Sequence, residues 1–508
     1  MIGTDVSLAR CASATGLVGL AVALIAGCGT TAPPVSPSSS APSTTTSANV
    51  YEQQRTAGVQ AALDVLGDAL RSGDPNRVDT VVDAAAAPEF RRHLQVIATN
   101  LGGHPVAPES MASESVPGGS ISAESSPPRS TDEPRSPTSS PSSPAPVPTI
   151  PPRGTALRLK EFRYEVVPST EAEVLVPAGL QQRLDAQGSS DSWVAPVDLR
   201  YALGGAATPG LDEPDVTLNM QLVMARYGDD WKVVGDATAI GGTAAPAQLW
   251  DLPGLAATDV ATDGGTSVIA SYPGTAETVD RVRGLLPGAV VAVDEFWGED
   301  WPRRAAVVAT DRPAEFRALA RSAGTDVTGA AAATVHSRVD TDDDVAVGQR
   351  VILTPGADQL SDAALGVVLR HELTHVATRV VTAAGAPLWI TEGVSEYVGR
   401  KGTYGRFDDA APDLAAQIRA GDLPADLPAD RDFAVDSEEA VVAYQSAWSV
   451  AAFVADRFGE DELRTLYTGV AADADPRRSD QAISDALGVS RTDFVADWQR
   501  WLSTQVRR

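Results

Sequence analysis

The segment HELTH, residues 371–375, lies inside an apolar stretch that runs from residue 365 to 381. A stretch of this length and character predicts a buried helix, on which positions i and i+4 lie one above the other. His371 and His375 can therefore direct two imidazole nitrogens at one point, about 2.0–2.1 Å from each, as a zinc ion requires. Glu372 is one position further around the helix, so its carboxylate can reach a water molecule on the open side of that point. The spacing predicts a metal site with a general base beside it.

A third donor is expected after a break in this helix. Residues 384–387, Ala-Gly-Ala-Pro, allow the chain to turn back, and a second helix that begins near residue 388 can face the first. Glu392 on this second helix would supply an oxygen ligand and complete a His₂Glu set with one open position, as in catalytic zinc sites. Glu396, one turn further on, is expected to accept a hydrogen bond from a ring N–H of His371 and so fix its tautomer.

The same residues also have purely structural interpretations. The HELTH pattern is short and occurs by chance in roughly a few of a thousand such sequences. The structural alternative is a helix with two buried histidines and an exposed glutamate. Two of the five histidines of the chain lie in the pattern and Glu392 follows it, which favours a metal site. Glu396 could instead be a solvated acid on the helix surface. We expect Gly393 to permit close contact between helices, and Trp389 and Tyr397 to be core residues.

HELTH followed by W-x-x-E-G-x-x-E-Y resembles the gluzincins, and among them the peptidase MA-like proteins related to thermolysin and to aminopeptidase N. The resemblance covers the C-terminal part of the chain. It implies a zinc metallopeptidase in which His371, His375 and Glu392 bind Zn²⁺ and Glu372 is the catalytic base. One departure is that 16 residues separate His375 from Glu392, slightly fewer than in the two best-known relatives. A shorter connecting loop explains this difference.

The resemblance also implies a catalytic role for Tyr444, at the start of an apolar helix that runs to Phe458. In related sequences a tyrosine in this place stabilises the oxyanion of the tetrahedral intermediate, an effect typically worth ~3 kcal/mol. An ordinary packed tyrosine is the alternative. The sequence has no aminopeptidase-type Gly-x-Met-Glu-Asn segment to hold the N-terminus of a substrate, so we expect an endopeptidase acting on proteins or peptides.

A competing hypothesis is a non-catalytic lipoprotein that binds an envelope partner on a peptidase-like fold. The intact Glu372 speaks against it, because proteins that keep an enzyme fold without activity commonly lose the base. A surface structural lipoprotein would leave the whole motif unexplained. His93, His104 and His336 have no partner at metal-ligand spacing and receive no role.

The first 27 residues predict export and attachment to a membrane. An apolar run from residue 11 to 27 follows Arg10 and closes on Ile-Ala-Gly-Cys, which resembles a lipobox ending at Cys28. The resemblance implies a cleaved lipoprotein signal peptide and a lipid anchor on Cys28, on the extracytoplasmic face of the cell membrane. An ordinary cleaved signal or an anchor helix is the alternative, although the run is short for a stable span. Because Cys11 and Cys28 are the only cysteines, the mature body has no internal disulfide.

Length and charge restrict the remaining possibilities. A chain of 508 residues is too long for one core and predicts two or three domains. The formal net charge of −27 argues against nucleic acid or an anionic membrane surface as a partner. Residues 28–50 and about 104–152 are rich in Ser, Thr and Pro, which predicts a flexible tether and a disordered insertion.

The predicted fold class is α+β, with two folded domains. Residues 51–240 begin with a helix whose Val59, Leu63, Leu66 and Leu70 share one face. Four predicted strands follow the insertion, at residues 156–167, 193–202, 215–226 and 231–236, the last two joined as a hairpin. Helices followed by such an antiparallel meander resemble NTF2-like (cystatin-like) domains.

Residues 255–508 are expected to form a mostly helical gluzincin peptidase domain with a small sheet. Its predicted elements before the motif are a helix over 275–286, a strand over 305–310, a helix from 313 and a strand over 350–353. Long helices then surround the metal motif.

Overall fold

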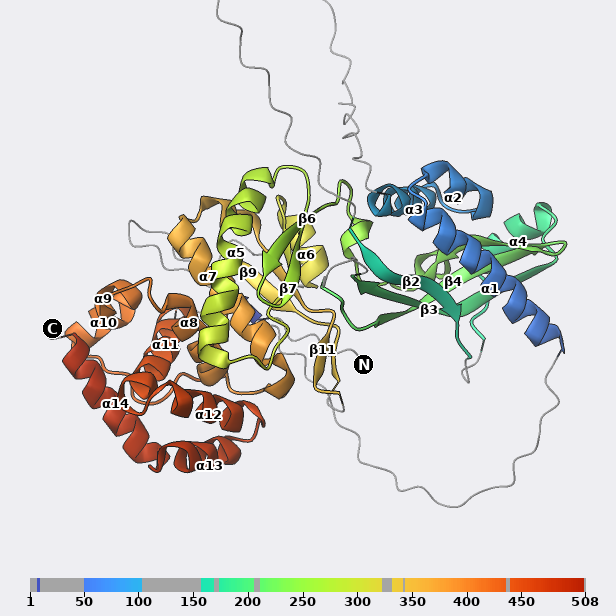
Figure 1. The fold of residues 1–508 in the computed structure, drawn as a ribbon. Helices are drawn as coiled ribbons and strands as arrows, with labels where there is room; N and C mark the ends of the chain where they lie inside the picture. The colour runs from blue at the N-terminus through green and yellow to red at the C-terminus, as the bar shows by residue number, and fades with distance from the viewer. Residues whose placement is uncertain are drawn as a thin grey trace, which may run out of the picture.

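A computed structural model describes residues 7–9, 50–102, 157–168, 173–204, 211–321, 331–340, 343–434 and 439–506. Cys28 and the predicted insertion at 104–152 lie outside the described residues, as does the tether except for its last residue. None of the described helices is long and apolar enough to cross a membrane. The described chain combines helices and sheets, as the predicted α+β class requires, and its N-terminal and C-terminal parts lie side by side (Figure 1).

The N-terminal part is a curved antiparallel sheet with helices on both faces. Its strands pair in the order β2-β3-β4-β5, which confirms the predicted meander. The elements are α1 (Val50–Arg71), α2 (Pro75–Val81), α3 (Pro88–Leu101), β2 (Leu159–Val166), α4 (Ala178–Ala186), β3 (Asp191–Leu203), β4 (Val216–Tyr227), β5 (Asp230–Asp236) and the short 3-10 helix η1 (Ala237–Ile240). The more specific NTF2-like resemblance stays a prediction.

Apolar spacing explains how these elements pack. The predicted apolar face of α1 is buried, because Val59, Leu63, Leu66 and Leu70 are each at most 1 % exposed. They pack with α2, α3 and one face of the sheet. Alternate strand residues such as Val194 point to the other face, where they pack against α4.

The C-terminal part is built on a six-stranded mixed sheet with the order β1-β9-β12-β8-β7-β6. Strands β7, β8 and β12 are parallel, and the other neighbours are antiparallel. The elements up to the metal motif are β1 (Ser7–Ala9), η2 (Leu249–Asp251), β6 (Ala256–Thr262), β7 (Gly265–Ser271), α5 (Ala276–Trp297), β8 (Ala306–Ala309), α6 (Pro313–Ala320), β9 (Ala332–Val335), β10 (Arg338–Asp340), β11 (Val345–Val347), β12 (Arg350–Leu353) and η3 (Pro355–Gln359).

Helices make up the rest of the C-terminal part (Figure 1). They are α7 (Asp362–Thr378), η4 (Arg379–Val381), α8 (Leu388–Arg400), α9 (Phe407–Ala410), α10 (Pro412–Arg419), η5 (Asp430–Phe433), α11 (Ala440–Arg457), α12 (Glu460–Ala471), α13 (Pro476–Leu487) and α14 (Arg491–Gln505). The two faces of the sheet belong to different cores. Val351 of β12 packs with α5 and α7, whereas its neighbour Ile352 belongs to a cluster that continues into the N-terminal part.

Three features of the C-terminal part differ from the sequence-based expectation. The helix expected over residues 275–286 continues through Pro287 to Trp297, where Val290, Val293 and Phe296 are fully buried. Burial of this apolar face offsets the backbone hydrogen bond that a proline inside a helix removes. The sheet is larger than expected, since β6, β7 and β9 were not predicted. Residues 7–9, which fall in the predicted signal peptide, form a strand at the edge of this sheet.

Candidate metal centre

Helix α7 holds the two histidines of the motif. The Ser361 hydroxyl caps its N-terminus by accepting a hydrogen bond from the backbone N–H of Ala364. His371 and His375 lie one turn apart on its buried side, and their Nε2 atoms are 3.1 Å from each other. The helical i, i+4 spacing therefore brings two imidazole nitrogens to one place, as expected.

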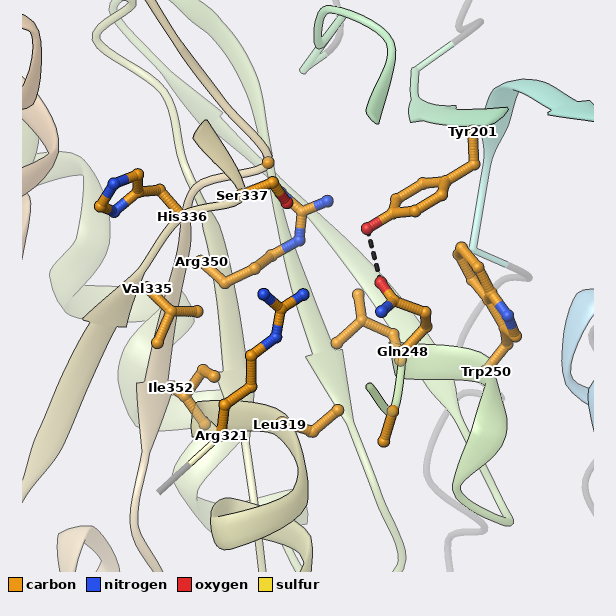
Figure 2. Close-up of a pocket in the computed structure, with 13 residues that line it drawn as sticks. Tyr201, Gln248, Trp250, Leu319, Arg321, Val335, His336, Ser337, Arg350 and Ile352 are labelled. Atoms are coloured by element: carbon orange, nitrogen blue, oxygen red, sulfur yellow. Dashed lines mark hydrogen bonds between the residues drawn. The ribbon is translucent and has the colours of Figure 1, made fainter. Parts of the chain in front are cut away.

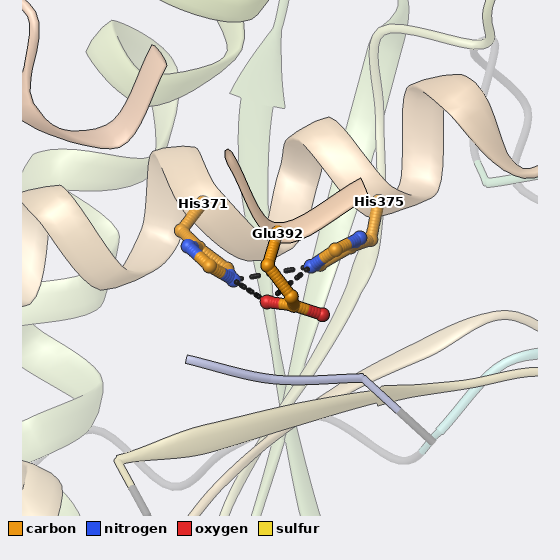
Figure 3. A group of neighbouring side chains, drawn as sticks. All are labelled: His371, His375 and Glu392. Atoms are coloured by element: carbon orange, nitrogen blue, oxygen red, sulfur yellow. Dashed lines mark hydrogen bonds and ion pairs between the residues drawn. The ribbon is translucent and has the colours of Figure 1, made fainter. Parts of the chain in front are cut away.

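Glu392 of α8 points at the same place (Figure 3). Its Oε2 lies 3.3 Å from Nε2 of His371 and 3.6 Å from Nε2 of His375. All three side chains are buried, and one possible ligand atom from each lies within 4.8 Å of the others. The two helices thus bring together the three residues that the sequence analysis selected as metal ligands.

Two glycines let α8 approach its neighbours closely enough to place Glu392. A Cβ atom on Gly399 would lie 3.0 Å from the carbonyl oxygen of Val367 on α7, and one on Gly393 would lie 2.6 Å from the carbonyl oxygen of Ala447 on α11. The expected role of Gly393 in close helix contact is confirmed. Helix α8 is therefore fixed between α7, which carries the histidines, and α11.

Burial and mutual charge control the protonation of the three donors. Burial lowers the pKa of His375 to about 4, so this imidazole is neutral near pH 7 and its nitrogen can bind a metal. Burial also acts to lower the pKa of His371, but its hydrogen bond to Glu392 and the nearby carboxylates outweigh burial and raise that pKa. For Glu392, burial favours the neutral acid, yet the two histidines hold the pKa of its carboxyl well below the usual range. The carboxylate form of Glu392 is the one expected of a metal ligand.

Ser395 orients His375, a contact that sequence analysis did not identify. Its hydroxyl donates to the carbonyl of Thr391 at 2.9 Å, and its oxygen lies 3.3 Å from Nδ1 of His375. Because the hydroxyl proton is used on Thr391, the oxygen is free to accept Nδ1–H. This tautomer leaves Nε2 without a proton on the side of the metal position.

Glu396 faces His371 from the side away from the three donors. Its Oε1 lies 3.8 Å from Nδ1 of His371, and neither of these buried atoms has a hydrogen-bond partner among the described residues. The separation is longer than a hydrogen bond, so the proposed acceptor role stays a prediction. The other oxygen of Glu396 accepts a hydrogen bond from Nε of Arg400 at 2.5 Å, and Arg400 also donates to the carbonyl of Ala410.

Glu372 is outside the three-donor group, as its position one residue after His371 predicts. Its side chain is fully buried and accepts a hydrogen bond from the hydroxyl of Thr334 on β9. Thr334 was not found by sequence analysis, because nothing in the short segment Ala-Ala-Thr-Val shows that it passes beside α7. The contact joins β9, the strand next to the edge strand β1, to the candidate base.

Tyr444 lies near the beginning of α11 and is 1 % exposed. Its ring packs edge to face with Phe433, with 5.0 Å between ring centroids. It precedes Ala447, the contact point of α11 with α8, by about one turn. The oxyanion role of Tyr444 stays a prediction.

Comparisons with known proteins give only distant likenesses. No family model and no curated protein matches the chain. An M1 zinc metallopeptidase from Deinococcus radiodurans aligns with 12 % identity and a TM-score of 0.30, over 59 % of this chain and 61 % of that one. A mutant of the M1 zinc metallopeptidase from the same organism, bound to a Tyr-Ser-Ala substrate, aligns with 13 % identity and a TM-score of 0.29, over the same shares of the two chains.

A third solved structure is Legionella pneumophila aminopeptidase A in complex with aspartic acid. It aligns with 13 % identity and a TM-score of 0.29, over 48 % of this chain and 28 % of that one. The chain thus spans about three fifths of the Deinococcus proteins and less than a third of the Legionella protein. Likenesses this weak transfer neither an activity nor a substrate.

Proposed function

We propose that this chain is a zinc-dependent peptidase that hydrolyses peptide bonds of extracytoplasmic proteins or peptides, and that it acts as an endopeptidase. The observation that carries the proposal is the convergence of His371, His375 and Glu392 in a buried place, with Glu372 beside them. Two imidazole nitrogens and one carboxylate oxygen are the ligand set of catalytic zinc sites, which keep one position open.

The spacing of the donors supports zinc as the metal. Two ligands at about 2.0–2.1 Å from a tetrahedral zinc ion are about 3.3 Å from each other. The three separations among the Nε2 atoms and the Glu392 oxygen are 3.1, 3.3 and 3.6 Å, so a small tetrahedral ion fits with little movement. The neutral imidazole of His375 and the carboxylate of Glu392 match the same ion.

In this proposal the residues divide the chemistry of peptide hydrolysis between them. Bound zinc would polarise the substrate carbonyl and lower the pKa of a water molecule to about 7. Glu372 accepts the proton of the attacking water while the water oxygen bonds to the carbonyl carbon. It then delivers that proton to the amine nitrogen as the carbon–nitrogen bond breaks. Ser395 orients the imidazole of His375, Glu396 is the proposed acceptor for His371, and Tyr444 is the proposed donor to the oxyanion.

The edge of the C-terminal sheet supports a peptide as substrate. Strand β1 pairs antiparallel with β9, with Ser7 opposite Thr334, and passes beside the three donors as the pale blue strand in Figure 3. Removal of the predicted signal peptide would leave β9 as the edge, with backbone groups free to pair with another extended segment. The Thr334 side chain contacts Glu372, so a peptide in this register would lie beside the base.

The composition of β9 supports cleavage inside a chain. An exopeptidase that recognises a free α-amino group needs a carboxylate to pair with it, and β9 offers only Ala332, Ala333, Thr334 and Val335. This agrees with the absence of a Gly-x-Met-Glu-Asn segment. We therefore propose that substrates bind as extended strands and continue on both sides of the scissile bond.

The test of this function is cleavage of an unstructured protein such as casein by the purified chain, beside Glu372→Ala. We expect internal cleavage by the wild type, loss of cleavage on removal of zinc with a chelator, and recovery when zinc is restored. Glu372→Ala should be inactive. Absence of any Glu372-dependent cleavage over a broad set of unstructured proteins would instead favour the non-catalytic binding lipoprotein.

A further inference from the structure

A cavity of about 40 Å³ lies between the N-terminal and C-terminal parts of the chain. It is lined by the end of β3, by η2, by the end of α6 and by β9 and β12. Val335 and Ile352, which line it, belong to the core on the face of the sheet away from α7. The cavity is therefore separate from the metal centre, and a ligand site in it would not depend on the proposed peptidase function.

Two guanidinium groups point into this cavity, those of Arg321 and Arg350 (Figure 2). Tyr201 and Gln248 lie on the opposite side, whereas the imidazole of His336 turns away from the two arginines. Arg350 is buried and is paired with the buried carboxylate of Glu213. Both oxygens of this carboxylate accept hydrogen bonds from Arg350, one of them at 2.8 Å. This pair is complete without a ligand.

Arg321 has no such counter-ion. No carboxylate of the described chain forms an ion pair with it, although it ends α6 and is more than half buried. Burial lowers the pKa of its guanidinium, because the charged form loses contact with water. No ion pair with a described carboxylate offsets that loss.

The other polar groups around the cavity limit what could bind there. Tyr201 donates its hydroxyl to Gln248 at 2.5 Å, and the amide of Gln248 donates to the carbonyl of Pro246 at 2.9 Å. The hydroxyl proton of Tyr201 and one of the two amide protons of Gln248 are therefore already used. The planar guanidinium group of Arg321 is the main hydrogen-bond donor that remains, and the Ser337 hydroxyl also lines the cavity. This arrangement favours an acceptor with two oxygens in one plane.

The size of the cavity admits such an acceptor. A cavity needs about 10–15 Å³ to hold one water molecule, so about 40 Å³ leaves room for a small polar group such as a carboxylate. We propose that the cavity is a carboxylate-binding site in which Arg321 forms a bidentate pair with the ligand.

Thermal unfolding of the full chain in detergent tests this site. Melting temperatures would be compared in sodium formate, sodium acetate, sodium phosphate and sodium chloride at equal ionic strength, for wild type, Arg321→Gln, Arg321→Lys and Arg317→Gln. Arg317 is the matched control, because it lies one turn earlier on α6 and does not line the cavity. A blocked peptide with a single glutamate distinguishes a protein carboxylate from a free small acid.

We expect formate or acetate, or the glutamate peptide, to raise the melting temperature of wild type and Arg317→Gln by about 2–4 °C over chloride at ~10-fold excess over Kd. The rise should be smaller in Arg321→Lys and absent in Arg321→Gln. In chloride, Arg321→Gln should melt no lower than wild type, since it removes a charge that forms no ion pair with a described carboxylate. An equal rise in Arg321→Gln, no carboxylate effect in wild type, or a clear loss of stability of Arg321→Gln in chloride would overturn the proposal.

Discussion

At the scale of single residues, the candidate site depends on contacts that fix which atom of each side chain faces the metal position. Ser395 accepts from Nδ1 of His375, and Thr334 of β9 donates to Glu372. A general base first accepts a proton and then releases it. For Glu372, the direction in which its carboxylate points therefore matters more than a low pKa of its carboxyl group. Thr334 is therefore a positioning residue for Glu372.

The first prediction concerns that positioning. Thr334→Val keeps the shape and removes the hydroxyl, so kcat should fall by about tenfold, the equivalent of one hydrogen bond to a charged group. Zinc content and KM should change little, because neither the ligands nor the backbone groups of β9 are altered. Thr334→Ser, which keeps the hydroxyl, should restore most of kcat. Equal turnover in the valine and serine variants would contradict the role.

The second prediction separates two interpretations of Tyr444. If its hydroxyl donates to the tetrahedral oxyanion, Tyr444→Phe should lower kcat by ~10²-fold with KM little changed, because the interaction strengthens only in the transition state. Zinc content and melting temperature should stay as in wild type. A tyrosine that only packs against Phe433 would instead lose some stability and keep its turnover. The two measurements on one variant therefore decide between the interpretations.

At the scale of elements, the site exists because α8 is held between α7 and α11 at two glycines. Gly393→Ala should place a methyl group 2.6 Å from the carbonyl oxygen of Ala447 and force the helices apart. We expect a loss of stability of about 1–3 kcal/mol and weaker zinc binding, because Glu392 is the neighbouring residue. Chemical unfolding and zinc titration would measure these effects.

Gly284→Ala provides the control for this third prediction. Gly284 lies inside α5, and a Cβ atom there would meet nothing within 4 Å. Alanine at an open helical position should stabilise the protein by about 0.4–1 kcal/mol and leave zinc binding unchanged. If both alanine variants behaved alike, the close contact of α8 with α11 would not be what positions Glu392.

Much of the arrangement of elements could be predicted from local patterns, and the limits of that prediction have a physical cause. The i, i+4 histidines required only a helix, and β12 was expected at the residues where it occurs. Strand β9 was missed, because four residues rich in alanine show neither alternation nor a turn signal. Its pairing with β12 and its contact with α7 depend on residues far apart in the chain, as does the Arg350–Glu213 pair, which spans 137 positions.

At the scale of the whole molecule, the predicted lipid anchor would hold both folded parts at the membrane surface through a tether. The fourth prediction is that Cys28→Ser releases the protein from the membrane fraction or leaves the precursor uncleaved, because this thiol is the expected site of the lipid. A single acyl chain binds membranes only weakly, so a multiply acylated cysteine is needed for stable attachment. Normal maturation and unchanged membrane association of the variant would refute the anchor.

The proposed activity depends most on the separation of metal ligands from base, and zinc analysis of four variants tests it directly. His371→Ala, His375→Ala and Glu392→Ala should each lose stoichiometric zinc, because each removes one of three converging donors. Glu372→Ala should keep one zinc per chain, since its carboxylate pairs with Thr334 and lies outside the donor group. Loss of zinc from Glu372→Ala, or full zinc in any of the three donor variants, would contradict this division of ligands and base.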